Sequence, residues 1–227
     1  MVPLPQDTVL DALRFVDLVG VLANALLGGL VARTARLDPV GFAVLAIVSG
    51  LGGGLIRDTL LQRGTPVALI DEAYVLTALA GATIAFLLPV EGRLWARVFP
   101  YVDALALGAW AAAGAQKTLV LGLGWLPAIL LGTITAVGGG LVREVLLNRV
   151  PSIFGGNTLY ATSALLASGV MVLLHQAGHG TAGLVVTTVV GAGLTLAARW
   201  RGWQLPDAYA WQGRLATLAR PRWRRRR

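Results

Sequence analysis

SGLGGGLIRD, residues 49–58, returns in the same order of residue types as TAVGGGLVRE at residues 135–144. Each copy holds three consecutive glycines, two apolar residues, an arginine and an acid, and the arginines, Arg57 and Arg143, lie 86 residues apart. An offset kept over most of the chain predicts that two copies of one unit make up most of the protein. The same offset joins Asp17 to Asp103, Gly28 to Gly114, Arg63 to Arg149 and Tyr74 to Tyr160.

The composition is that of a membrane protein. Mean hydropathy is +0.71, hydrophobic residues make up 56% of the chain and charged residues 13%, against about 25% charged in a typical soluble domain. Because the chain has no cysteine, disulfides, thiol nucleophiles and thiolate metal sites are excluded. The first residues lack a basic region, so a cleaved signal peptide is not expected. The net charge of +8 comes largely from the arginines of residues 220–227.

Seven apolar stretches are each roughly 18–25 residues long, which is enough to cross a bilayer. They are expected near residues 9–32, 39–62, 73–90, 99–119, 125–148, 158–176 and 181–199.

The charges of the connecting loops orient these spans. One side receives most of the arginines, and the other receives little beyond Arg14, Arg63 and Lys117. The positive-inside rule then places the C-terminus in the cytoplasm and, for an odd number of spans, the N-terminus outside. The arginine-rich side holds Arg33, Arg36, Arg93, Arg97, Arg149 and the tail.

A repeat of three spans is also odd, so the second copy inserts upside down relative to the first. The predicted fold is therefore an all-α integral membrane protein with seven transmembrane helices, in two inverted three-helix repeats plus a seventh helix. The expected divisions are a first repeat over 1–90, a second over 91–178, the seventh helix over 179–200 and a basic cytoplasmic tail over 201–227.

Each glycine triplet needs a physical reason, because a glycine costs a helix about 1 kcal/mol relative to alanine. One reason is an unwound or kinked backbone whose freed carbonyls face a cavity rather than lipid. The alternative is close packing of two helices. Two triplets at equivalent inverted positions favour kinked helices that line a pathway, with Gly52, Gly53, Gly54, Gly138, Gly139 and Gly140 along it.

The arginine after each triplet lies at the depth of an aspartate in its own repeat. An ionisable group inside a membrane is costly unless it is paired or hydrated. Two interpretations stay open, and they are compatible. Asp17–Arg57 and Asp103–Arg143 form structural pairs, or the arginines line a pore and set its field. The acids that follow the arginines lie nearer the helix ends and are expected to be solvated.

Lys117 has no counterpart, because the equivalent position is Val31. A lysine there either snorkels to the membrane surface or guards the mouth of a pathway. Ser49 and Thr135 are polar groups expected at depth along the same pathway, although such hydroxyls often bond back to their own helix.

Other functional signals are weak. The glycine-rich segments match neither the phosphate-binding loop Gly-x-x-x-x-Gly-Lys-Ser/Thr nor the dinucleotide-binding motif Gly-x-Gly-x-x-Gly. His175 and His179 stand four residues apart across a probable loop without a third ligand nearby, so no metal site is expected. No catalytic constellation recurs at a consistent depth, so the protein is not expected to be an enzyme. The arginine-rich tail follows a membrane span, which favours anionic lipid headgroups over nucleic acid.

The doubled motif, together with Gly64-Thr65-Pro66, Gly114-Ala115-Gln116-Lys117 and Leu159-Tyr160-Ala161, resembles the bacterial branch of the TRIC family, the trimeric intracellular cation channels. The resemblance covers roughly residues 10–200. It implies a homotrimer with one hourglass pore per protomer, formed largely by kinked helices two and five, and conduction of monovalent cations, mainly potassium.

Two segments depart from the family pattern. Animal members carry a Lys-Glu-Val motif associated with lipid binding and gating, where this chain has Gln116-Lys117-Thr118, so that role is not carried over. The second copy ends in Arg143-Glu144, where bacterial sequences usually have Arg-Asp.

The expectation is a passive potassium channel of the bacterial cytoplasmic membrane with no cofactor beyond the transported potassium or sodium ions. Some bacterial relatives carry a glycine-transporter label, so the alternative is a secondary transporter of a small amino acid such as glycine, whose carboxylate a helix N-terminus could bind.

Overall fold

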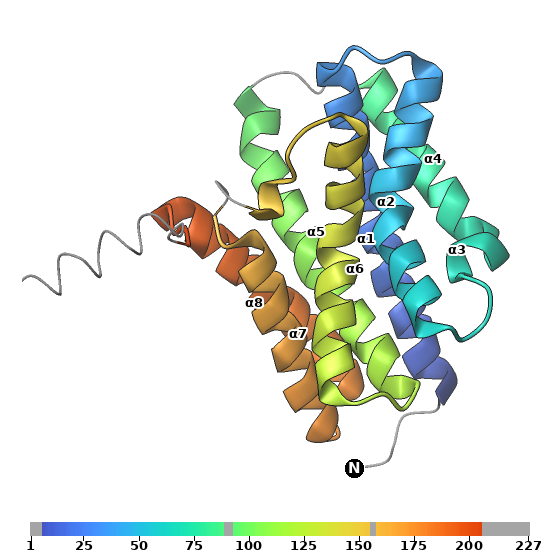
Figure 1. Cartoon of the computed structure of the whole chain (residues 1–227), viewed down its shortest axis with the longest axis vertical. Coiled ribbons are helices and arrows are strands. Elements are labelled where there is room, and N and C mark those ends of the chain that lie inside the picture. Colours follow the sequence, from blue (N-terminus) through green and yellow to red (C-terminus); the bar gives the residue numbers. More distant parts are fainter. Residues whose placement is uncertain (1–5, 89–92, 155–157, 206–227) are drawn as a thin grey trace, which may run out of the picture.

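The computed structural model describes residues 6–88, 93–154 and 158–205 of the chain, and within these ranges it is helical with no strand. The helices pack side by side into one bundle (Figure 1). Their bounds are α1 (Gln6–Thr34), α2 (Pro39–Leu61), α3 (Val67–Ile70), α4 (Glu72–Leu87), α5 (Arg93–Val120), α6 (Trp125–Leu146), the 3-10 helix η1 (Ser152–Phe154), α7 (Tyr160–Gln176) and α8 (Gly180–Arg201).

Five of these helices, α1, α2, α5, α6 and α8, are long and apolar enough to cross a membrane. Helix α4 is apolar but has 16 residues, and α7 has 17. The protein is therefore an all-helical membrane protein, while the count of seven spans stays a prediction. The spans expected at 73–90 and 99–119 left residues 91–98 as a loop, and this prediction is wrong in part. Arg93 and Arg97 belong to α5, which continues through Pro100.

Corresponding helices recur at the offset of the doubled motif. Helix α2 begins at Pro39 and α6 begins 86 residues later, at Trp125. Helix α1 packs against α2 and α4, and α5 packs against α6 and α7 in the same way. In Figure 1, α1 starts at the lower end of the bundle and α5 starts at the upper end, so these two helices run in opposite directions.

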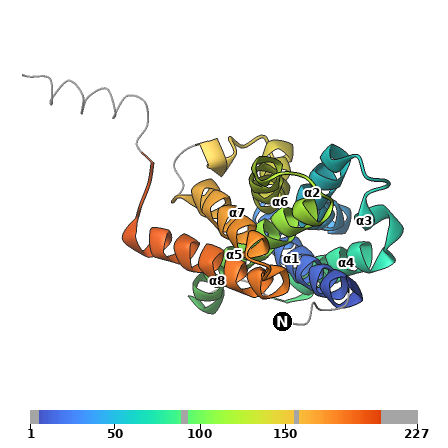
Figure 2. The same ribbon diagram turned by 90° about the horizontal axis from the view of Figure 1, so that it is seen from below.

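Helix α8 lies outside these two groups of three and packs along α5 and α7, as the view from below shows (Figure 2). Small residues make this contact close. A Cβ at Gly191 would lie 2.8 Å from the Cα of Gly108, which leaves no room for a larger residue. Removing both side chains lets the two backbones approach, which is how membrane helices gain packing energy without a hydrophobic driving force.

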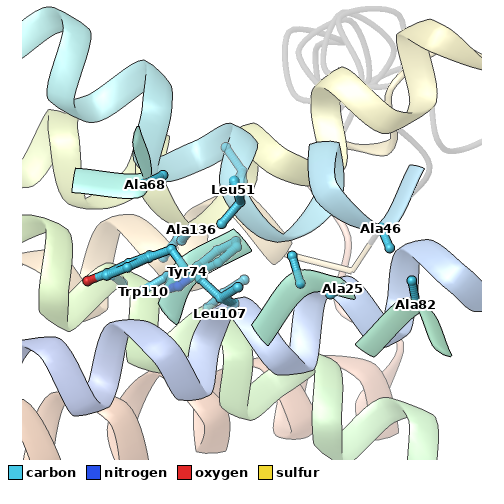
Figure 3. Close-up of a cluster of buried hydrophobic side chains, with 14 of the residues drawn as sticks. Ala25, Ala46, Leu51, Ala68, Tyr74, Ala82, Leu107, Trp110 and Ala136 are labelled. Carbon is cyan, nitrogen blue, oxygen red and sulfur yellow. The ribbon is translucent and has the colours of Figure 1, made fainter. Parts of the chain in front are cut away.

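The centre of the bundle is built from alanine around a few large side chains (Figure 3). Trp110 of α5 is 1% exposed and is one of the largest buried side chains. Its ring nitrogen donates to the backbone carbonyl of Asp17 on α1 at 3.4 Å. Ala25, Ala46 and Ala136 belong to the same buried cluster. Their small side chains let the helices that carry them pack closely.

Helices α2 and α6 cross at the two glycine triplets. A Cβ at Gly53 would overlap the carbonyl oxygen of Thr135, and a Cβ at Gly139 would overlap the carbonyl oxygen of Ser49. Because Gly139 and Thr135 are the duplicated positions of Gly53 and Ser49, one contact is made twice, in reciprocal directions.

The structure corrects one part of the expectation for the triplets, the unwound backbone. Both triplets lie inside continuous α-helix, with no unwound residue between Pro39 and Leu61 or between Trp125 and Leu146. The close packing of two helices, given as the alternative, is present, because the glycines let the two backbones touch.

Candidate functional site

Arg57 is the centre of a buried group of charges near the end of α2. Its Nη2 donates to Asp17 of α1 at 3.2 Å, and its Nε donates to the neighbouring Asp58 at 2.8 Å. The Arg57 side chain is only 1% exposed. The predicted structural pair between Asp17 and Arg57 is therefore formed.

Two further residues complete this group. Lys117 of α5 lies 2.8 Å from Asp58 through its Nζ, and the hydroxyl of Tyr74 on α4 donates to Asp17 at 3.2 Å. We call Asp17, Arg57, Asp58, Tyr74 and Lys117 the Arg57 cluster. Its two acids and two cations come from three helices and balance in charge. A buried charge needs such pairing, since unpaired burial costs several kcal/mol.

The cluster corrects two expectations. Asp58 is not solvated, because it is 7% exposed and accepts bonds from both Arg57 and Lys117. Lys117 does not snorkel to the surface, because its side chain is 27% exposed and is paired with Asp58. This pair could not be predicted from the sequence, since the two residues are 59 positions apart and Lys117 has no duplicated counterpart.

A small cavity of about 10 Å³ lies against the cluster, lined by residues that include Asp17, Gly54, Arg57 and Trp110. The Nη1 of Arg57 is buried without a hydrogen-bond partner in the described part of the chain. A cavity of this size holds about one water molecule. The site can therefore hydrate Arg57 but has no room for a larger ligand in this conformation.

The short helix α3 covers the same end of the bundle. The backbone N–H of Val67 donates to Asp58 at 3.1 Å, and Ala68 is buried against the cavity. The segment is also held at its far end, where Arg14 of α1 donates to Asp71 at 2.6 Å. Asp71 caps α4 by accepting from Ala73 N–H. The Arg14 guanidinium and this backbone bond hold the pKa of Asp71 below its ordinary value.

The duplicated residues form a looser group at the opposite end of the bundle. Asp103 accepts a bond from the Tyr160 hydroxyl at 2.8 Å, as Asp17 does from Tyr74. No ion pair joins Asp103 to Arg143 in the described residues, and the buried Nε of Arg143 has no hydrogen-bond partner there. The second predicted structural pair is therefore not formed.

Neighbours outside the duplication account for part of this difference. Arg199 of α8 adds a second cation whose field acts on Asp103, whereas the position equivalent to Lys117 is Val31. Glu144, expected to be solvated, accepts from the N–H and the hydroxyl of Ser152 at 2.6 and 3.2 Å. Like Asp58, it fastens the segment that follows its helix.

The predicted polar pathway residues lie between these two ends. Ser49 and Thr135 are fully buried at the crossing of α2 and α6. Thr135 donates to the carbonyl of Leu131 on its own helix at 2.6 Å, and the Ser49 hydroxyl has no partner within the described ranges. The predicted site residues thus form three separate places: Arg57 with Lys117, the glycine crossing, and Arg143.

Two tyrosines have roles that were not predicted from the sequence. Tyr74 bonds Asp17 and Tyr160 bonds Asp103, and each pair is separated by 57 residues. That equal separation, together with the 86-residue offset of the pairs, was a usable signal for two equivalent contacts. Trp110 gave no such signal, because its contact to the Asp17 carbonyl crosses between the two groups of helices.

Comparison with known proteins places these features in a group of bacterial membrane proteins. The family model described as "Glycine transporter" matches residues 14–89 and again residues 100–176, and the two matches start 86 residues apart. The UPF0126 membrane protein of Deinococcus radiodurans is 37% identical over 85% of this chain and 88% of its own. The UPF0126 inner membrane protein YadS of Escherichia coli K12 is 30% identical over 90% of this chain and 95% of its own.

The fold also matches a solved structure. The structure of the TRIC trimeric intracellular cation channel orthologue from Rhodobacter sphaeroides superposes with a TM-score of 0.77. The two chains are 31% identical, and the match covers 83% of this chain and 97% of the other.

Proposed function

Because this chain belongs to the TRIC-like family of bacterial membrane proteins, we propose that it is a channel that passes monovalent cations, chiefly potassium. The observation that carries the proposal is the match along nearly the full length of a TRIC cation channel orthologue, at 31% identity. The activity is passive conduction, so no catalytic residue and no cofactor takes part.

The proposed pathway runs through each protomer between α1, α2, α5 and α6 and narrows in an hourglass at the glycine crossing. Opening it requires α2 and α6 to separate there, because Ser49 and Thr135 are covered in this conformation. Separation would present their hydroxyls and carbonyls, which are suitable ligands for a cation that loses part of its hydration shell.

The arginines set the field at the two ends of this pathway. In the Arg57 cluster, Asp17 and Asp58 offset Arg57 and Lys117, so an approaching cation meets a charge-balanced group rather than a bare positive barrier. Arg143 lacks an equivalent ion pair in the described residues, so its charge is offset less at the other end. The two ends therefore present different fields to the same ion.

The arrangement in the membrane is part of the proposal. Seven helices span it as two inverted groups of three plus α8, with the N-terminus outside and the C-terminus in the cytoplasm. Three copies associate as a homotrimer. The arginine-rich tail, which lies outside the described residues, contacts anionic lipid.

The alternative function, secondary transport of glycine, has its support in the description of the matching family model. The cavity beside Arg57, at about 10 Å³, holds about one water and is smaller than even this amino acid. A transporter would need a conformation with a larger cavity, just as the channel needs α2 and α6 to separate, so the channel is favoured by the match to a cation-channel structure rather than by this cavity.

Recordings from the purified protein in planar bilayers test the proposal. With asymmetric potassium chloride, we expect unitary current steps and a reversal potential near the potassium equilibrium value. A reversal potential near the chloride value contradicts cation selectivity. Saturable glycine uptake into vesicles, competed by unlabelled glycine and without unitary steps, supports the transporter instead.

A further inference from the structure

The start of α5 and the end of α8 form a corner on the outside of the bundle (Figures 1 and 2). The two helices run antiparallel, and the rings of Tyr101 and Trp200 meet edge to face with centroids 6.3 Å apart. Both rings are largely exposed, at 46% and 71%. Such exposed aromatic side chains are typical of the level where lipid headgroups meet the hydrocarbon core.

Among the residues that the structure describes, the charge of this corner is strongly unbalanced. Four exposed arginines lie on it, and the guanidinium of Arg201 stacks over the Trp203 ring at 5.2 Å. The nearby acid in the described part of the corner is Asp103, which is partly buried and bonded to Tyr160. The arginines are Arg93 and Arg97 on α5 and Arg199 and Arg201 on α8.

Exposed apolar side chains lie on the same two helices. Val98 and Leu105 on α5 and Val189 on α8 are 38%, 51% and 63% exposed. An anionic phospholipid has the matching order of groups, with a phosphate that arginine binds through paired N–H donors and acyl chains below it. A free phosphate would use only the charged part of this surface.

We propose that the α5–α8 corner binds an anionic phospholipid, with Arg97 and Arg201 on its phosphate and Tyr101 and Trp200 at the headgroup level. This site lies on the folded bundle and is distinct from the arginine-rich tail. It also stands apart from the channel activity, because none of these side chains belongs to the Arg57 cluster or to the glycine crossing.

Native mass spectrometry of the full-length protein tests the site. The probe is dioleoyl phosphatidylglycerol, with the corresponding phosphatidylcholine and inorganic phosphate as comparison ligands. The test variant is Arg97→Gln/Arg201→Gln. The matched control is Arg36→Gln/Arg63→Gln, which removes two exposed arginines from loops away from the corner. All are also made with Arg220, Arg222 and Arg224–Arg227 replaced by Gln, which removes the arginine cluster at the end of the tail.

We expect the wild type to retain phosphatidylglycerol in preference to phosphatidylcholine. The corner variant should bind it about 30-fold more weakly, which corresponds to about 1 kcal/mol for each arginine, and the control should bind as the wild type does. Arg97→Lys/Arg201→Lys should recover part of the loss. Equal binding by the corner variant and its control, or equal competition by inorganic phosphate, overturns the proposal. Melting curves of both variants show whether a loss comes from misfolding.

Discussion

Gly53 of α2 lies against the carbonyl oxygen of Thr135 on α6, so closely that the two helices touch through their backbones. The duplicated residue Gly139 makes the same contact with Ser49. No side chain separates the helices at these points, so their spacing depends on the absence of a methyl group. Each triplet also contains a glycine that faces away from the crossing, which supplies an internal control.

Gly53→Ala and Gly139→Ala should each lower the stability of the protein by roughly 1–3 kcal/mol, the usual cost of overpacking. Gly54→Ala and Gly140→Ala should be tolerated, because an added Cβ would meet only an arginine side chain at 3.6 Å and alanine favours helix by about 1 kcal/mol. Thermal melting in detergent measures all four. Equal losses at Gly53 and Gly54 would mean that the crossing is not the reason for the triplet.

Arg57→Ala should destabilise the protein strongly, by roughly 3–5 kcal/mol, because it leaves Asp17 buried without its cation. Asp17→Asn/Arg57→Ala should recover part of this loss. Arg143→Ala should cost less, since no ion pair joins it to Asp103 in the described residues, and Asp103→Asn/Arg143→Ala should be close to additive. Chemical or thermal unfolding of these four variants and of the single changes Asp17→Asn and Asp103→Asn measures the coupling in each pair, and additivity at the first pair contradicts the Arg57 cluster.

Lys117→Gln should raise potassium conductance at low salt. The change takes the Arg57 cluster from balanced to net negative, which attracts a cation with a strength that salt screens. The difference from wild type should therefore shrink as potassium chloride is raised. Single-channel recordings at two salt concentrations measure it, with Arg63→Gln, an exposed residue just beyond α2, as the control for general surface charge. Conductance that is unchanged at both concentrations places Lys117 outside the ion pathway.

The Arg14–Asp71 pair should make a small pH-dependent contribution to stability. The pKa of Asp71 is lowered in the folded protein from an ordinary value of 3.8, so the stabilisation is complete above that value and is lost as pH falls through the lower folded pKa. Asp71→Asn keeps an N-cap residue but removes the charge. The melting temperatures of wild type and variant should differ slightly at neutral pH and converge in acid. A gap that widens in acid contradicts the pairing.

The arrangement in the membrane can be tested without any functional assay. A reporter fused after Arg227 should read as cytoplasmic, and a tag placed before Pro3 should be accessible from outside, because seven spans put the ends on opposite sides. Both ends on one side would remove the seven-span arrangement and the inverted repeat with it.

The equivalence of α2 and α6 was accessible from the sequence because it rests on period and spacing. The 86-residue offset between Arg57 and Arg143 predicted equivalent helices, and α2 and α6 begin at equivalent residues. The backbone state of the triplets was not accessible, since glycine permits both an unwound helix and a tight crossing. Which one forms depends on whether a second backbone is near.

The ion pairs, too, could be predicted from the sequence only in part. The Asp17–Arg57 pair followed from equal depth in the membrane, a property that span boundaries supply. The Lys117–Asp58 pair did not, because it needs α5 of one copy beside α2 of the other. The duplication also led to one wrong prediction, because Asp103 and Arg143 have the same residue types as Asp17 and Arg57 but form no ion pair in the described part of the chain. Their surroundings include α8, which is not duplicated.

Lys117 occurs in only one of the two duplicated units, and this should make the ionic current depend on its direction. A duplication alone gives both ends of a molecule the same charges, and a conductor with identical ends passes equal current in both directions. One ammonium at one end, with Val31 at the equivalent place, adds to the difference that the ion pairs of Arg57 and the position of Arg199 on α8 already make between the two ends. In identical solutions on both sides, protein inserted in a single orientation should therefore act as a weak rectifier, and Val31→Lys should make its current–voltage relation less curved.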